Sequence, residues 1–327
     1  MNIKRNINTK EICDQIKKGN ITALSKAITL SESNIDSDQE LANKILAKLK
    51  TKNNDSIRIG ITGVPGAGKS TFIESFGNHI TNLGLKLAVL TIDPSSSVTK
   101  GSILGDKTRM ETLSANKNVF IRPSPASNFQ GGVGKNTRES IFLCESAGYD
   151  IILIETVGVG QNEISVAEMV DFFLLLKISG SGDELQGIKR GIIEMSDLIA
   201  INKCDGDNVK DSIKAKNEFK LALQLFPKKK SNWKPQVLTC SSLTGEGLAE
   251  IWECITNYVN LTKKNNYFYE NRINQNKSWL LQIIDYSLRK SFFNRKSIKI
   301  KLNNLIKKIE EQKVSIFEAS RKILSEI

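Results

Sequence analysis

The glycine-rich run GVPGAGKST at residues 63–71 constrains the fold of this chain more than any other stretch. An apolar segment at residues 57–61 precedes it and predicts a buried strand, and residues 72–83 predict a helix after it. In such a unit the glycines let backbone N–H groups point at a β-phosphate, a lysine reaches the β- and γ-oxygens, and a hydroxyl ligates Mg²⁺. The alternative is a glycine-rich turn without a ligand, which the flanking strand and helix disfavour. We therefore predict a phosphate-binding loop (P-loop) with Lys69 as a catalytic residue and Ser70 as a metal ligand, made of Gly63, Val64, Pro65, Gly66, Ala67, Gly68, Lys69, Ser70 and Thr71.

The alternation of strand-like and helical segments predicts the fold class. Between residues 56 and 260, strands are expected at residues 57–61, 86–92, 119–121, 151–155, 171–177, 197–202 and 236–240, with helical segments between them. This alternation implies right-handed crossovers and therefore an α/β fold of the P-loop NTPase type, with a mostly parallel sheet and helices on both faces. Ligands of such a sheet bind at the carboxyl ends of its strands.

Helical patterns flank this P-loop domain on both sides. Apolar residues recur at helical spacing through residues 8–50, which predicts two or three amphipathic helices. A second helical region after residue 261 has an apolar face made of Trp279, Leu280, Ile283, Ile284 and Leu288. We expect three parts: an N-terminal helical extension at residues 1–55, the P-loop domain at residues 56–260 and a C-terminal helical arm at residues 261–327.

Acids near the ends of expected strands are candidate metal ligands. Asp93 ends the second strand and Asp106 follows a short way on, so either carboxylate could join the shell of Mg²⁺ directly or through water. Asp93 could instead cap a turn, because a proline follows it. Glu155 ends the apolar strand at residues 151–155 and is both a candidate metal ligand and a candidate catalytic residue.

The residues after Glu155 are expected to face the γ-phosphate. Gly158 can donate its N–H to that phosphate, as the equivalent glycine does in other P-loop hydrolases. Many GTPases have a glutamine directly after this glycine to orient the attacking water, whereas this chain has Val159. Gln161 lies two residues further on and is a catalytic candidate only if the loop rearranges. We therefore expect slow intrinsic hydrolysis.

The run NKCD at residues 202–205 predicts which base is bound. It closes an apolar strand, and the carboxylate of Asp205 can accept hydrogen bonds from guanine N1–H and the 2-amino group, for which adenine has no matching donors. A surface loop without a ligand is the alternative, and the order of the motifs along the chain disfavours it. The expected ligands are GTP and GDP, with Mg²⁺ as cofactor. The predicted contacts to the base are Asn202, Lys203, Asp205, Ser241, Ser242 and Leu243.

The chain resembles the MeaB/ArgK family, the GTPases associated with cobalamin-dependent methylmalonyl-CoA mutase. The resemblance extends from about residue 8 to the C-terminus and rests on the runs GVPGAGKST, DPSSS, SILGDKTRM, ETVGVGQNE, GDELQGIKRGIIEMSDL, NKCDGDN and SSLTGEG. The glutamate of ETVGVGQ and the stretch GDELQGIKRG distinguish this family from ordinary small GTPases. The chain departs from the family pattern at Ser179, where proline is usual, and at Lys177, where glutamine is usual. Both departures touch the loop that communicates with the mutase in the family.

The resemblance implies roles for individual residues. It assigns Lys69 and Ser70 to phosphate and metal, Asp93, Asp106 and Glu155 to the metal environment, and Asn202, Lys203 and Asp205 to guanine. It also implies a third switch at residues 179–190, in which Lys189 is a further catalytic candidate. From the residues alone, Asp183 and Glu184 would be a helix N-cap and a first-turn acid. The resemblance makes the C-terminal arm a homodimerisation arm, and a helix folded back on its own domain is the alternative.

The resemblance implies a GTP-hydrolysing chaperone of a cobalamin-dependent acyl-CoA mutase of the methylmalonyl-CoA mutase type. Such a chaperone gates the loading of the cobalamin cofactor and protects the mutase. Two alternatives stay open. One is an ATPase or kinase associated with lysine, arginine and ornithine transport, which the NKCD run disfavours. The other is a GTP-dependent switch without useful turnover.

Composition argues against several other classes. The net charge of +12 comes from scattered lysines, and no basic segment is interleaved with aromatic residues, so no nucleic-acid partner is expected. No apolar run approaches the roughly 20 residues of a membrane span, and the basic first residues lack the apolar core of a signal peptide. The five cysteines have no CxxC spacing and predict reduced thiols, while the single histidine, His79, excludes a histidine-based triad. We expect a cytoplasmic protein.

Overall fold

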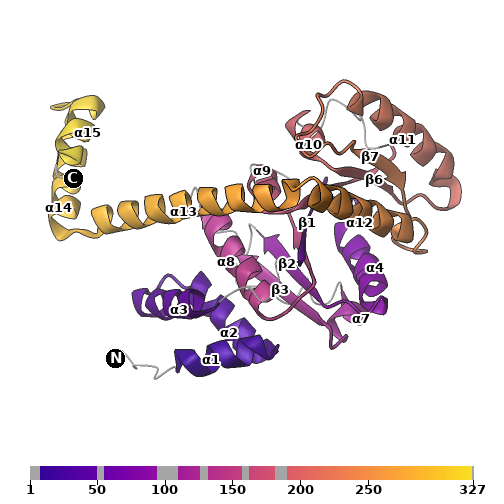
Figure 1. The fold of residues 1–327 in the computed structure, drawn as a ribbon. Helices are drawn as coiled ribbons and strands as arrows, with labels where there is room; N and C mark the ends of the chain where they lie inside the picture. The colour runs from indigo at the N-terminus through magenta and orange to yellow at the C-terminus, as the bar shows by residue number, and fades with distance from the viewer. Residues whose placement is uncertain are drawn as a thin grey trace. The chain divides into compact units, whose positions relative to one another are not determined.

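A parallel sheet organises the larger of two compact units (Figure 1). The structure is a computed structural model and describes residues 8–49, 55–93, 110–125, 132–156, 162–180 and 190–325. The two units are Met1–Gln275 and Asn276–Ile327. In the first unit, the described strands follow the order β3-β2-β4-β1-β5-β6-β7, and every pairing between them is parallel.

The observed strands confirm the predicted fold class. They are β1 (Ile57–Gly63), β2 (Leu87–Asp93), β3 (Val119–Pro125), β4 (Ile151–Glu155), β5 (Phe172–Ile178), β6 (Leu198–Asn202) and β7 (Gln236–Thr239). Each lies where the sequence predicts a strand. β1 runs on to Gly63, which pairs with Leu176, and β3 runs on to Pro125, which pairs with Asp93. Glycine and proline are poor strand formers, so pairing with a neighbouring strand sets these two ends rather than local preference.

Helices connect the strands and extend the chain at both ends. The described helices are α1 (Thr9–Lys17), α2 (Ile21–Glu32), α3 (Asp36–Lys48), α4 (Lys69–Asn82), α7 (Glu111–Ser114), α8 (Gly132–Ser146), α9 (Asn162–Ala167), α10 (Arg190–Met195), the 3₁₀ turn η1 (Gly206–Asn208), α11 (Val209–Leu223), α12 (Leu248–Lys264), α13 (Tyr267–Asn294), α14 (Lys296–Glu310) and α15 (Ile316–Leu324). None of them has both the length and the apolar character that crossing a membrane requires.

Alternate residues of the strands face two different helix layers. On β4, Ile152 and Ile154 pack into a core with α1–α3 and α8, whereas Ile151 and Leu153 pack into a core with α4 and α12. This is the period of two that a strand imposes on its side chains. Helices therefore cover both faces of the sheet, as the sequence predicts.

The N-terminal helices α1–α3 share one core with the sheet. Ile16, Leu24 and Ile28 are fully buried in the core that also contains residues of α8 and β2. Asn8 and Asn20 cap the first two helices, because their side-chain oxygens accept hydrogen bonds from backbone N–H groups of the first turns. Three helices thus occupy the segment for which two or three are predicted. The functional boundary at residue 55 stays a prediction.

Buried ion pairs and hydrogen bonds anchor the first turns of α13, up to Gln275, on the rest of the first unit. The guanidinium of Arg272 donates to Asp171 Oδ2 and to the carbonyl of Ser56, both at 2.6 Å. Arg58 pairs with the buried carboxylate of Glu145 at 2.8 Å. Gln275 donates to the backbone carbonyl of residue 170 at 2.7 Å. The compact division therefore falls inside α13, after Gln275, and the predicted functional boundary at residue 260 stays a prediction.

The second unit contains the rest of α13 with α14 and α15. α14 and α15 pack against each other through a small core of Ile298, Leu305, Ala319 and Ile323. Along α13, large apolar side chains are exposed to solvent. They are Leu280, Leu281, Ile284 and Leu288, with exposed fractions of 58%, 67%, 45% and 63%.

Candidate functional site

The P-loop joins β1 to α4 at the carboxyl edge of the sheet. β1 ends at Gly63 and α4 begins at Lys69, with Gly68 as the N-cap of the helix. Gly68 has φ +83°, a left-handed conformation that favours glycine, and a Cβ there would lie 2.8 Å from Asn202 Nδ2. A Cβ on Gly63 would lie 2.4 Å from the carbonyl oxygen of Leu176. The glycines at these positions therefore allow the loop to curl close to β5 and β6.

Lys69 lies over the backbone of the loop. Its Nζ donates to the carbonyl oxygens of Gly63 and Val64 at 2.8 and 3.3 Å. Burial lowers the pKa of this amine, while the carboxylates of Glu155 and Glu163 act to raise it. Lys69 therefore lies over the loop that would hold a phosphate, and the charges of two carboxylates favour its protonated form.

The candidate metal ligands lie at the same edge. Ser70 is half-buried in the first turn of α4. Glu155 ends β4 between Ile61 of β1 and Thr91 of β2, and Asp93 ends β2 two residues beyond Thr91. Among the described residues, no cluster of three or more His, Cys, Asp or Glu side chains could hold a metal by itself. This donor set fits Mg²⁺, which takes hard oxygen ligands and is usually bound by one or two carboxylates with phosphates and several waters.

Asn202 connects the P-loop with the loops predicted to bind the base. Its side chain is 1% exposed, and its Nδ2 donates to the carbonyl of Ala67 at 2.9 Å. Its Oδ1 accepts from the backbone N–H and the hydroxyl of Ser242, at 3.0 and 2.7 Å. Ser75 of α4 adds a second connection, because its hydroxyl donates to the carbonyl of Ser242. The amide of Asn202 therefore bridges the P-loop and the loop at residues 241–243, and acts as a brace between the two halves of the candidate site.

Asp205 is positioned by the neighbouring loop. The hydroxyl of Ser241 donates to Asp205 Oδ2, and the backbone N–H of Thr244 donates to the same hydroxyl oxygen at 3.1 Å. Lys203 has φ +58°, and its carbonyl accepts from the side chain of Asn208 at 2.7 Å. Leu243, in the neighbouring loop at residues 241–243, is 82% exposed. The carboxylate is therefore oriented within the protein and keeps acceptor positions for a base.

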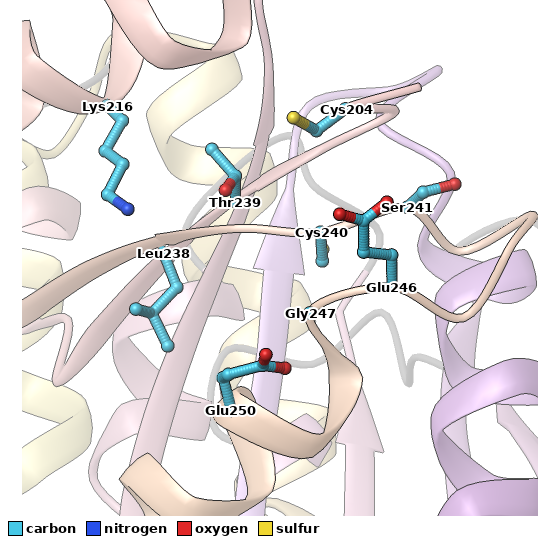
Figure 2. Close-up of a pocket in the computed structure, with 9 residues that line it drawn as sticks. All are labelled: Cys204, Lys216, Leu238, Thr239, Cys240, Ser241, Glu246, Gly247 and Glu250. Atoms are coloured by element: carbon cyan, nitrogen blue, oxygen red, sulfur yellow. The ribbon is translucent and has the colours of Figure 1, made fainter. Parts of the chain in front are cut away.

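A small pocket adjoins these loops (Figure 2). It encloses about 210 Å³. Two of its lining residues belong to the candidate base-binding loops: Cys204 directly precedes Asp205, and Ser241 begins the loop at residues 241–243. Figure 2 shows Lys216 of α11 at the upper left of the pocket and Glu250 of α12 at its bottom. Burial raises the pKa of the Cys240 thiol to about 12, so this lining cysteine stays neutral. The volume is below the roughly 300 Å³ of ordinary ligand pockets.

The two departures from the family pattern are accommodated by this chain. Lys177 is 2% exposed, and its amine lies 5.8 Å from the ring centroid of Phe219. The hydroxyl of Ser179 donates to Asn208 Oδ1 at 2.6 Å, and Asn208 in turn holds the carbonyl of Lys203. A proline at position 179 could not make this bond. The start of the segment at residues 179–190 is therefore connected to the loop that carries Asp205.

The structure brings most of the predicted site residues to one edge of the sheet. The P-loop residues 63–71, Asp93, Glu155, residues 202–205 and residues 241–243 all lie at the carboxyl ends of strands. Asp106, Gly158, Gln161 and Lys189 lie outside the described residues. No motif marks Ser75, and Glu163 lies in the run ETVGVGQNE without a role predicted for it. The hydrogen bond of Ser75 to Ser242 and the burial of Glu163 distinguish these two residues in the folded chain.

Comparison with known proteins relates this chain to one family of GTPases. The model of a protein family described as methylmalonyl Co-A mutase-associated GTPase MeaB matches residues 24–297. The chain is 46% identical over 266 residues to GTPase ArgK of Escherichia coli, covering 81% of this chain and 80% of that protein. It is 43% identical over 302 residues to the mitochondrial methylmalonic aciduria type A homolog of Mus musculus, covering 89% and 73%.

Further similarities concern a bacterial relative and a solved structure. The chain is 45% identical over 269 residues to a probable GTPase of Mycobacterium tuberculosis, covering 82% of this chain and 80% of that protein. A crystal structure described as an LAO/AO transport system kinase is similar with a TM-score of 0.75 and 34% identity, covering 98% of both chains.

Proposed function

The chain belongs to the MeaB family of methylmalonyl Co-A mutase-associated GTPases, and we propose that it is a GTP-hydrolysing chaperone of a cobalamin-dependent acyl-CoA mutase. In this proposal it gates the loading of the cobalamin cofactor and protects the mutase. The observation that carries the proposal is the 2.9 Å hydrogen bond from Asn202 to Ala67, which joins the P-loop to the NKCD run at one sheet edge. Phosphate recognition and base recognition thereby form one site.

The proposed chemistry is attack of water on the γ-phosphate. Lys69 would exchange one of its two carbonyl acceptors for a phosphate oxygen and offset the charge that develops there. Ser70, Asp93, Asp106 and Glu155 would hold Mg²⁺, which would supply positive charge against the transferring phosphoryl group. Gly158 would donate its N–H to the γ-phosphate, and Gln161 or Lys189 would orient the water.

The proposed base is guanine, bound as GTP or GDP. Asp205 would accept from the donors of guanine in the orientation that Ser241 gives it. Asn202 would act by bracing the loops, with Lys203, Ser242 and Leu243 beside the base. Guanine recognition is supported by the GTPase names of the relatives in Escherichia coli and Mycobacterium tuberculosis.

The proposed partner is an acyl-CoA mutase of the methylmalonyl-CoA mutase type. The description of the family and the name of the mouse relative support this choice. The third switch at residues 179–190 would relay the nucleotide state, and the Ser179–Asn208 hydrogen bond of 2.6 Å would connect it to the base loop. We propose a cytoplasmic location and no nucleic-acid partner.

The proposed assembly is a homodimer. The apolar side chains exposed along α13, among them Leu281 and Leu288 at 67% and 63%, supply a surface that a second copy could cover. Burying such side chains contributes a transfer free energy of about 25 cal/mol for each Å² of apolar surface, from which the entropic cost of association is subtracted. The arm at residues 261–327 would then be the dimerisation arm.

The test is transfer of cobalamin onto the cofactor-free mutase. We expect loading to differ between GTP and a non-hydrolysable analogue, because a partner that prefers one switch state must change affinity when the γ-phosphate leaves. The charge reversal Asp183→Lys should leave GTP affinity nearly unchanged but remove this difference. Identical loading with both nucleotides in the wild type would exclude the gatekeeper function.

The second candidate is an ATPase or kinase associated with transport of lysine, arginine and ornithine. The similarity to the structure described as an LAO/AO transport system kinase favours it. Competition of ATP and GTP for the site separates the two candidates, since the transport function in this form requires ATP.

A further inference from the structure

Glu163 is a buried carboxylate to which the proposed chemistry assigns no role. It is the second residue of α9 and is only 2% exposed. Its Oε2 has no hydrogen-bond partner among the described residues. A buried acceptor without a partner costs about 1–3 kcal/mol, and more when it is charged. Such groups are rare in native proteins, so this oxygen is a candidate acceptor for a hydrogen bond from a bound ligand or its water molecules.

The fold holds Glu163 in place. α9 packs closely on β1, since a Cβ added to Gly60 would lie 3.1 Å from Cγ1 of Val166. Val166 is fully buried, and Met169 just after the helix is 1% exposed. α9 cannot turn outward to hydrate Glu163 without breaking this packing. The carboxylate therefore stays in the interior.

The position of Glu163 relates it to the phosphate site. It is the second residue of α9, and this helix packs on β1, the strand that leads into the P-loop, through Val166 and Gly60. The charge of Glu163 also favours the protonated form of the Lys69 amine, as that of Glu155 does. The amine donates to the carbonyl oxygens of Gly63 and Val64. The charges of two carboxylates thus act on one ammonium group, and a bound triphosphate would add further negative charge. Such a site favours a hydrated divalent cation, whose bound waters donate to nearby carboxylates.

We propose that Glu163 is a positioning residue of the phosphate site, whose unpartnered Oε2 accepts a hydrogen bond from a water molecule of the hydrated Mg²⁺ ion that Ser70 and Glu155 would hold. This inference rests on the proposed Mg²⁺-dependent binding of guanine nucleotides. Glu163 touches a metal-bound water and neither the metal nor the nucleotide. It therefore sets the affinity for Mg²⁺ and the place of the ion, rather than the affinity for the base.

The test compares Glu163→Gln with the matched control Glu168→Gln in the full-length protein. Glu168 lies five residues further along the same segment and is exposed. The affinity for a fluorescent GDP and for a fluorescent non-hydrolysable GTP analogue is measured at increasing free Mg²⁺ and also in EDTA. We expect Glu163→Gln to raise the Mg²⁺ concentration for half-maximal binding by about 10- to 100-fold, the usual effect of losing an outer-shell partner. Affinity in EDTA should be unchanged or higher, because a negative charge near the phosphates has gone.

A second readout separates positioning from a structural role. The melting temperature of the nucleotide-free Glu163→Gln protein should equal or exceed that of the wild type, because the variant removes a buried carboxylate whose Oε2 has no partner among the described residues. Equal Mg²⁺ dependence in the wild type and both variants would overturn the role of Glu163 alone. Equal losses of affinity with and without Mg²⁺, together with a lower melting temperature, would mark Glu163 as merely structural and also overturn it. A wild type whose binding does not depend on Mg²⁺ would overturn this inference and the proposed metal site together.

Discussion

The substitution Asn202→Ala tests whether the two halves of the site are braced by one side chain. Asn202 is 1% exposed, and its amide bonds to the P-loop through Ala67 and to the neighbouring loop through Ser242. Alanine removes the amide and leaves the carbonyl of Ala67 and the N–H of Ser242 without these partners. Ala67 is fully buried and Ser242 is 5% exposed, so bulk water cannot readily replace the lost bonds.

The magnitude follows from the two groups left unpaired. A buried donor or acceptor that loses its partner costs about 1–3 kcal/mol, so the free energy of unfolding should fall by about 2–6 kcal/mol. The Ser242 hydroxyl adds little to this sum, because it can rotate toward another acceptor. Nucleotide affinity should also fall by at least about tenfold, or 1.4 kcal/mol, since the phosphate loop and the base loop lose their fixed relation.

The assay is urea unfolding of the nucleotide-free protein, followed by tryptophan fluorescence, together with titration of fluorescent GDP. The matched control is Asn217→Ala on the exposed side of α11, which should change the free energy of unfolding by less than about 0.5 kcal/mol. A loss below about 1 kcal/mol for Asn202→Ala, with unchanged affinity for GDP, would refute the brace.

Three further predictions concern catalysis, assembly and thiol chemistry. Lys69→Ala should abolish GTP hydrolysis in single-turnover assays and leave the circular-dichroism spectrum unchanged; residual wild-type turnover would remove Lys69 from the mechanism. A chain that ends at Gln275 keeps the Arg272 ion pairs and should be monomeric in light scattering while it still binds GTP. A chain that ends near residue 261 loses them and should be less stable by about 3–5 kcal/mol. Burial raises the pKa of Cys240 and Cys254 to about 12, so their reactive thiolates are scarce near neutral pH and increase only as the pH approaches that value. Mass spectrometry after iodoacetamide treatment should therefore find the half-exposed Cys204 labelled first.

The sheet shows how far sequence patterns predict this structure. Apolar runs such as residues 151–155, placed between polar breakers, identify strands because the signal is local. The P-loop and the NKCD run could be placed at the carboxyl edge for the same reason. The strand order β3-β2-β4-β1-β5-β6-β7 could not be predicted in full, because it depends on which distant strands pair.

The parts that could not be predicted rest on contacts between distant residues. The Asn202–Ala67 bond joins residues 135 positions apart, and Arg58 and Gln275 are 217 positions apart. No local pattern marks Glu163 as buried or Arg272 as the anchor of α13. The family pattern gives Asn202 to guanine, which stays a prediction, and no local pattern reveals that its amide also bonds Ala67 and Ser242 within the protein. The sequence motifs thus predict which loops form the candidate site, whereas the long-range hydrogen bonds that position these loops could not be predicted.

In the proposed function, the carboxylate of Asp205 distinguishes GTP from ATP. Ser241 orients Asp205, and the N–H of Thr244 orients Ser241 at 3.1 Å, so the acceptor is in place before a base arrives. Guanine presents N1–H there, whereas adenine presents the acceptor N1, and a site built for a donor rejects such an analogue by about 10⁴–10⁵-fold. Ser241→Ala removes the orienting bond but keeps Asp205, so we expect the preference for GTP over ATP to shrink by about tenfold, the worth of one hydrogen bond to a charged group. Competition of ATP and GTP against a fluorescent guanine nucleotide measures both values. Comparable affinity for ATP in the wild type would contradict guanine recognition by Asp205 and favour the transport-associated function.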